Sequence, residues 1–335
     1  MIVALAVAAA FAAEPYVVLP NDTVEHIAET LGDPTLAEAI RTRNQLEAGA
    51  QPRVGTVLML PDTAETTPQD AALLSWSGTL RLQVAGATTP PYSGLALPDG
   101  SSVCTDDNSF ATVRLASTPT QHDDLSLLPK TCVTIDAVSA RAAERRSLVT
   151  LAKGSITTRD LTGDLATNGQ IAVRSASGLT AGKGGGFRVS IEADAARTEA
   201  LGHGVDVLGA GERVQVPAGY GARVQTSQAP QQPVKLLGAT SALRPDAGAE
   251  LIRPDFGWTP VDRALGYRVQ IASDADFANI QRSEDVPGAD WTPELLLLDY
   301  RVDGLWWRVS AFDRSGFEGF ASDARALRLP KGVGP

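Results

Sequence analysis

The stretch YVVLPNDTVEHIAETLGDPTLAEAIRTRNQLEAGAQPRVGTVLMLP, residues 16–61, decides the fold of the first part of this 335-residue chain. Residues 16–19 are a short β-prone run that Pro20 ends. Asp22 is placed to cap a helix, with Glu25 three residues later as in a capping box. An amphipathic helix is then predicted by the i, i+3, i+4, i+7 spacing of Val24, Ile27, Ala28 and Leu31.

A second helix and a closing strand follow. Gly32 ends the first helix, and Asp33-Pro34 supplies the N-cap and first position of the next. The second apolar stripe consists of Leu36, Ala39 and Ile40, and residues 57–60 form the closing strand. The segment therefore predicts a compact strand–helix–helix–strand unit, which is too small to bury much apolar surface by itself.

This unit resembles the LysM module. The family's opening Y-x-V-x-x-G-D-T-L-x-x-I-A corresponds to residues 16–28, with Asn21 in place of the usual Gly, a residue that tolerates the left-handed region. Its I-x-x-x-N-x-L corresponds to residues 40–46, and its G-x-x-L-x-I-P to residues 55–61, with Leu60 for Ile. The resemblance implies binding of N-acetylglucosamine-containing polymers such as peptidoglycan.

The resemblance also implies a shallow groove between the two loops of the unit. Backbone amides and carbonyls in such a groove suit an acetamido group, and an apolar edge suits its methyl. The alternative is that these residues only cap and close the helices. The glycan-binding residues carried over are Asn21, Asp22, Thr23, Val24, Gln45, Leu46 and Glu47.

Residues 1–13 are predicted to be a signal peptide. Their apolar run is too short to cross a bilayer, and Ala10-Phe11-Ala12 offers an A-x-A cleavage site. No basic residue precedes the run, so a buried strand is the alternative. With this leader, we expect a periplasmic or cell-wall-associated protein.

Charge and cysteine content narrow the function classes. A net charge of −10 argues against nucleic acid or anionic lipid as partners. Cys104 and Cys132 are the only cysteines, and in an oxidising compartment we expect them to form a disulfide. Two free buried thiols are the alternative. There is no C-x-x-C motif, so no metal site is predicted.

After a predicted linker at residues 62–74, residues 75–227 show apolar alternation broken by Gly and Asp/Asn turns, which is typical of many short strands. A helix is predicted around residues 139–148. Two segments, 93–117 and 171–221, resemble FecR-type periplasmic β-domains, although Gly184 to Val189 departs from that family's R-G-T-x-F-x-V motif. The resemblance implies a non-catalytic sandwich or solenoid-like β-domain that serves signalling or interaction.

A second linker, 228–242, is predicted before a third unit at residues 243–330. Strands with aromatic residues and four of the five tryptophans fall in this unit, where they are expected to form a core. The layout resembles fibronectin type III-like β-sandwiches, which space domains or bind partners. The predicted fold class is therefore mainly β and multidomain.

Catalytic patterns are weak. The three histidines, His26, His122 and His203, form no H-E-x-x-H or H-x-H motif, and neither cysteine lies in a nucleophile motif. We therefore predict no enzyme and no cofactor. The expected function is anchoring to peptidoglycan and presenting the other domains to an envelope protein partner, for example a membrane sensor. The alternatives are a peptidoglycan hydrolase or transpeptidase using Cys104 or Cys132 with His203, and a regulator of sigma-factor signalling.

Overall fold

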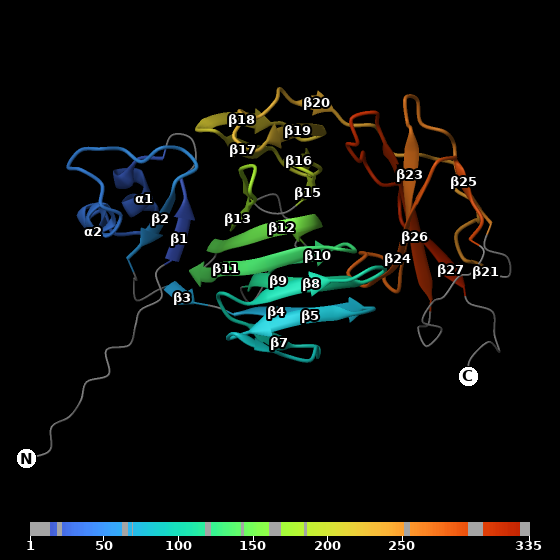
Figure 1. The fold of residues 1–335 in the computed structure, drawn as a ribbon, viewed down its shortest axis with the longest axis horizontal. Coiled ribbons are helices and arrows are strands. Elements are labelled where there is room, and N and C mark those ends of the chain that lie inside the picture. The colour runs from blue at the N-terminus through green and yellow to red at the C-terminus, as the bar shows by residue number, and fades with distance from the viewer. Residues whose placement is uncertain are drawn as a thin grey trace, which may run out of the picture.

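The computed structural model describes residues 14–18, 22–61, 66–68, 70–117, 122–141, 144–160, 169–183, 186–250, 255–293 and 304–328. The predicted signal peptide lies outside these ranges. The prediction of a mainly β chain is confirmed, and its parts follow one another along the long axis: a small N-terminal unit, a large curled β-structure and a C-terminal unit (Figure 1). Among the described helices, none has the length and apolar character needed to cross a membrane.

The N-terminal unit consists of β1 (Glu14–Val17), α1 (Val24–Thr30), α2 (Leu36–Arg43) and β2 (Val57–Leu60). The two strands pair antiparallel with Tyr16 opposite Leu58. The first apolar stripe turns inward: Val24, Ile27, Ala28 and Leu31 form the core of the unit together with Ile40. Leu36 and Ala37 pack against this core, whereas Ala39, predicted in the second stripe, is exposed.

The expected cap of α1 was wrong by one residue. Thr23, not Asp22, is the N-cap, and its hydroxyl accepts a hydrogen bond from the His26 amide at 3.0 Å. Asp22 instead accepts a hydrogen bond from the Tyr16 hydroxyl. The Glu25 side chain is bonded to Arg41 and Gln51 across the unit, and within the described residues no capping-box bond joins it to the backbone of Asp22 or Thr23. The start of the helix shifts because a β-region conformation at Thr23 satisfies the first free amides directly.

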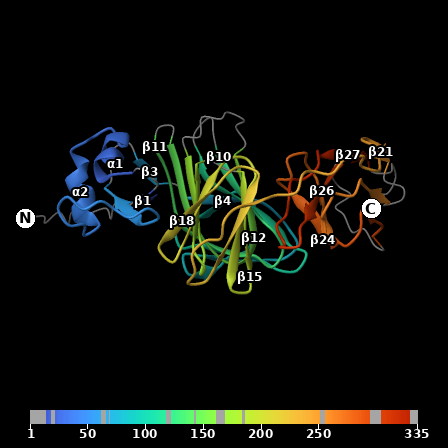
Figure 2. The same cartoon turned by 90° about the horizontal axis from the view of Figure 1, so that it is seen from above.

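Two curled sheets make up the central β-structure, which we call the barrel (Figures 1 and 2). Sheet one contains β3 (Thr66–Pro68), β5 (Leu80–Val84), β6 (Ala87–Thr88), β8 (Ser102–Thr105), β11 (Cys132–Arg141), part of β12 (Glu144–Asp160), β13 (Gly169–Arg174), β14 (Leu179–Lys183), β17 (Val205–Gly209) and β18 (Glu212–Val216). Sheet two contains β4 (Ala71–Ser77), β7 (Leu95–Leu97), β9 (Phe110–Ser117), β10 (His122–Leu127), the rest of β12, β15 (Phe187–Glu192), β16 (Ala195–Ala200), β19 (Tyr220–Gln225) and β20 (Val234–Lys235).

The long strand β12 joins the two sheets. Up to Lys153 it pairs with β11 and, in parallel, with β13, and from Gly154 onward it pairs with β15 and β10. Gly154 has φ +87°, and a Cβ there would come within 2.4 Å of the Thr131 Cα. Glycine therefore permits the bend at which the strand changes sheet. β12 thus joins the two sheets along one side, and the full set of strand pairings forms a closed barrel, where the sequence predicted a sandwich or a solenoid.

The apolar alternation seen in the sequence fills the space between the two sheets. Inward-facing residues from both sheets form one continuous core, including Leu73, Val113 and Leu125 from sheet two and Val133 and Ile135 from sheet one. Cys104 of β8 lies opposite Cys132 of β11, and the two form the predicted disulfide.

Three predicted boundaries in this region were wrong. The predicted helix at 139–148 is wrong, because its described residues, 139–141 and 144–148, belong to β11 and β12, where Arg145 is buried in an ion pair with Asp123. A buried charge breaks the alternation by which a strand is recognised. The predicted linker 62–74 contains β3 and the start of β4, and the linker 228–242 contains β20.

The C-terminal unit contains a five-stranded sheet, in the order β21 (Ala249–Glu250), β27 (Arg325–Arg328), β26 (Leu305–Phe312), β23 (Gly266–Ala272) and β24 (Ile280–Val286), and a short pair, β22 (Phe256–Gly257) and β25 (Asp290–Trp291). Its core is aromatic: Phe256 contacts Trp291 and Trp307, with ring centroids 5.1 and 5.0 Å away. Neighbouring Trp306 points the other way and packs beside Phe277 at the contact with the barrel.

Candidate functional site

Two regions carry grouped polar chemistry: the loops of the N-terminal unit, where the sequence predicted a glycan groove, and the contact between the barrel and the C-terminal unit. In the first region, Asn21 lies outside the described residues. Asp22 and Thr23 are half-buried and bonded within the unit, as given above. The Val24 side chain is fully buried in the core, so only its backbone faces the loop.

The second loop supplies more accessible groups. Gln45 and Glu47 are exposed, and Gln45 adopts φ +55°. Leu46 packs against the core of the unit. The Ala50 amide donates to the Glu47 carbonyl at 3.0 Å, which closes a turn directly before Gln51. The structure thus leaves two of the predicted side chains free to meet a ligand from this loop.

Gln51 joins the two loops and was not predicted as a site residue. Its side-chain oxygen accepts a hydrogen bond from the Val24 amide at 3.0 Å, and its side-chain amide donates to Glu25 at 3.0 Å. Hydrogen bonds from Gln51 and Arg41 lower the pKa of Glu25 to about 2. A lone glutamine before a proline carries no sequence signal for this role, so only the fold reveals it.

The N-terminal unit is fixed to sheet one. The Gln170 side chain accepts from the Val17 amide at 3.1 Å and donates to the Val17 carbonyl at 3.0 Å, and both bonds are buried. Val17 also lies in an apolar cluster with Leu148 and Leu179. The Arg146 guanidinium lies over the Tyr16 ring, 4.9 Å from its centroid. Since Tyr16 also bonds Asp22, the barrel touches the same side chain that holds the first loop.

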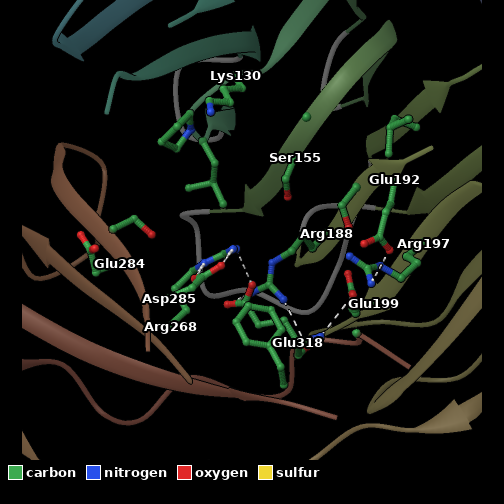
Figure 3. A pocket seen from close by; sticks show the side chains of 18 of the residues that line it. Lys130, Ser155, Arg188, Glu192, Arg197, Glu199, Arg268, Glu284, Asp285 and Glu318 are labelled. Atoms are coloured by element: carbon green, nitrogen blue, oxygen red, sulfur yellow. Dashed lines mark hydrogen bonds and ion pairs between the residues drawn. The ribbon is translucent and has the colours of Figure 1, made fainter. Parts of the chain in front are cut away.

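The second region is a cavity of about 620 Å³ between the barrel and the C-terminal unit. Its walls are strongly charged, and Figure 3 shows arginines of both parts pointing toward Glu318. Arg188 of β15 lies 3.2 Å from one carboxylate oxygen of Glu318, and Arg268 of β23 lies 2.8 Å from the other. Burial by itself would raise the pKa of Glu318, but these two guanidinium groups, together with a hydrogen bond from Ser310 and the charge of Arg308, outweigh it and hold the pKa below its ordinary value.

Glu199 of β16 lies on the other side of this network and is only 1% exposed. One of its oxygens accepts a hydrogen bond from the Glu318 amide at 3.4 Å, and the other has no partner among the described residues. Burial raises the pKa of Glu199 to about 7, and the Glu318 carboxylate adds to this, while Arg188 and Arg197 oppose it. A carboxyl that titrates near neutral pH thus lies where two parts of the chain meet.

None of these interfacial residues was predicted as a site. Arg188, Glu199 and Arg268 lie on strands of the alternating regions. Arg188 and Glu199 are buried and Arg268 is partly buried because the C-terminal unit covers sheet two: the Arg188–Glu318 contact joins residues 130 apart in the chain. The only signal for them in the sequence is a charged residue inside a strand of alternating apolar residues.

The alternative catalytic pair is not assembled. Cys104 and Cys132 are both consumed by the disulfide, and His203 lies in the connection between β16 and β17. Within the described part of the chain, no group of three or more His, Cys, Asp and Glu side chains is placed to hold a metal ion.

Comparisons with known proteins give little further guidance. No family model and no curated protein matches the chain. Two crystal structures of a candidate anti-sigma factor from Parabacteroides distasonis ATCC 8503 align at 14% identity, with TM-scores of 0.29 and 0.30; each alignment covers 40% of this chain and 58% of that one. A β-1,2-glucanase from Parabacteroides distasonis aligns at 13% identity with a TM-score of 0.18, over 79% of this chain and 37% of its own. The chain thus spans little more than half the length of the anti-sigma structures, and these TM-scores are too low to assign a function.

Proposed function

We propose that this chain is an exported, cell-wall-associated binding protein whose N-terminal unit binds N-acetylglucosamine-containing glycan such as peptidoglycan. Its barrel and C-terminal unit then serve as a surface for an envelope protein partner. We call the unit at residues 16–61 a LysM-like module because its sequence motifs resemble those of that family.

The observation that carries the proposal is the meeting of the two loops. The Val24 amide bonds Gln51, so residues 22–24 lie beside the loop that exposes Gln45 and Glu47. Polar side chains and loop backbone are then available together over the apolar support of Leu46. This combination suits a sugar that carries hydroxyl and acetamido groups.

The contact between the module and sheet one supports a role for the module in orienting the rest of the chain. Because Gln170 and the cluster around Val17 hold the module on sheet one, a glycan bound at its loops would orient the barrel as well. A partner would then meet the barrel and the C-terminal unit in a defined orientation relative to the wall.

The test is retention of the full chain on purified peptidoglycan. Gln45→Gly with Glu47→Ala removes two exposed side chains, and Gly suits the positive φ at position 45. We expect this double variant to bind about tenfold more weakly, which corresponds to about 1.4 kcal/mol. Glu29→Gln, an exposed change near the far end of α1, is the matched control and is expected to bind like the wild type.

Equal retention of the double variant and the wild type would contradict glycan binding at these loops. Competition by soluble chitin fragments separates recognition of N-acetylglucosamine from attraction to charged peptide stems.

Two other functions suggested by the sequence have their own tests. The thiol hydrolase requires a reduced cysteine, so activity on muropeptides that appears only with reductant would favour it. The regulator of sigma-factor signalling requires capture of a sigma factor or its sensor.

A further inference from the structure

A small enclosed cavity of about 20 Å³ lies between the barrel and the C-terminal unit, apart from the larger one described above. The barrel contributes Ser126, Arg159 and Arg188 to its wall, and the C-terminal unit contributes Gln270, Arg308 and Glu318. Three guanidinium groups therefore surround a space of atomic size, at a boundary that forms only when the two parts are docked.

Several hydrogen-bond donors at this cavity lack a partner. Arg159 donates one Nη1–H to the Asp276 carbonyl, but its buried Nε and Nη2 have no hydrogen-bond partner among the described residues. The Ser126 hydroxyl, on a residue 6% exposed, has none there either. Buried donors without an acceptor are costly, which makes a guest that accepts hydrogen bonds favourable here.

Positive charge at the cavity also exceeds negative charge. Of the described residues on its wall, Glu318 is the one carboxylate, and it is shared between Arg188 and Arg268. Arg308 donates to the neutral Gln270 oxygen at 2.9 Å and lies over the Phe277 ring at 4.0 Å, so neither contact supplies a counter-charge.

Burial lowers the pKa of Arg159 and outweighs Asp124, Asp274 and Asp276, which lie near it and favour its charge. Asp124 pairs with Arg114 at 3.0 Å, and Asp274 accepts from the amides of Ala278 and Asn279. Burial, followed by repulsion from Arg188, lowers the pKa of Arg308 to about 10. Such a guanidinium is short of compensating charge.

We propose that this cavity binds a chloride ion. A space of this size admits a single water molecule or a monatomic anion, and larger oxyanions do not fit. Chloride accepts several hydrogen bonds at once and supplies the missing negative charge beside Arg159 and Arg308. Since its ligands come from both parts of the chain, the ion stabilises the docked arrangement and is released when the C-terminal unit separates from the barrel.

The first experiment measures unfolding of the full chain at constant ionic strength while chloride replaces gluconate, which is too large for the cavity. We expect the unfolding midpoint to rise by several degrees with chloride. Arg308→Met keeps much of the side-chain volume and removes the guanidinium, and it is expected to abolish most of this rise. Arg263→Met, at an exposed arginine of the same unit, is expected to retain the rise.

Crystals soaked in bromide provide a second measurement that does not depend on a variant folding. An anomalous peak between Arg159 and Arg308 supports the site. No peak in the cavity, or a midpoint that is the same in chloride and gluconate, means that water alone fills it and overturns the proposal. An unchanged chloride response in Arg308→Met also overturns it.

Discussion

Replacement of Glu199 by glutamine tests how the contact between the barrel and the C-terminal unit responds to pH. Glu199 is buried beside Glu318, and its pKa is raised to about 7 from the ordinary 4.5. The folded protein therefore binds a proton more tightly than the unfolded chain. The resulting stability is fully present below pH 4.5 and is lost as the pH rises through 7.

The magnitude follows from the two pKa values. At about 1.4 kcal/mol per pH unit, the difference between about 7 and 4.5 corresponds to about 3 kcal/mol. Most of this loss falls between pH 5 and pH 8. Glu199→Gln keeps the shape of the protonated side chain and cannot ionise, so the variant should lose about 2.5 kcal/mol less than the wild type over this range.

Urea unfolding at pH 5, 6, 7 and 8 measures this difference. Tryptophan fluorescence reports on the relevant region because four of the five tryptophans lie in the C-terminal unit. Because the two proteins differ only at position 199, the difference between variant and wild type removes every contribution that they share. Glu212→Gln, at an exposed position at the start of β18 in the other sheet, is the control and should leave the pH dependence unchanged. Equal pH dependence in Glu199→Gln and the wild type would refute the reasoning.

Three further predictions concern how the parts are held together. Gly154→Ala introduces a Cβ against backbone at φ +87° and should destabilise the barrel by about 2–5 kcal/mol in urea unfolding; a loss below 1 kcal/mol would mean that β12 can bend elsewhere. Gln170→Leu leaves the buried amide and carbonyl of Val17 unpaired, so amide exchange in residues 22–61 should accelerate while exchange in the barrel core stays slow. Replacing Cys104 and Cys132 together by serine should cost about 3–4 kcal/mol, and reductant should then have no further effect on the unfolding midpoint.

Local patterns were sufficient for the N-terminal unit and for the general character of the barrel. The 3.6-residue spacing of Val24, Ile27 and Leu31 places one face of a helix inward, and the structure buries all three. Alternation over Val133 and Ile135 likewise predicts a strand with one face in a core. The disulfide could be predicted because the chain has only two cysteines.

The same patterns failed where tertiary contacts bury charge. Residues 139–148 were expected to be helical, and the described ones, 139–141 and 144–148, are strand, because the Arg145–Asp123 ion pair allows arginine to occupy the interior. The expected start of the barrel after residue 74 was also too late, since β3 adds to β11, a strand more than 60 residues further along the chain. Neither pairing is visible in a short window of sequence.

The sequence by itself determined the order of elements at residues 14–60, the alternating strands of the barrel and the pairing of Cys104 with Cys132, because each depends on spacing along the chain or on a choice of one partner. Tertiary structure alone decided that β12 joins two sheets, that Gln51 links the two loops, and that Glu199, Arg188 and Glu318 meet. These contacts join residues far apart in the chain, and their energies depend on which surfaces become covered when the C-terminal unit docks on sheet two.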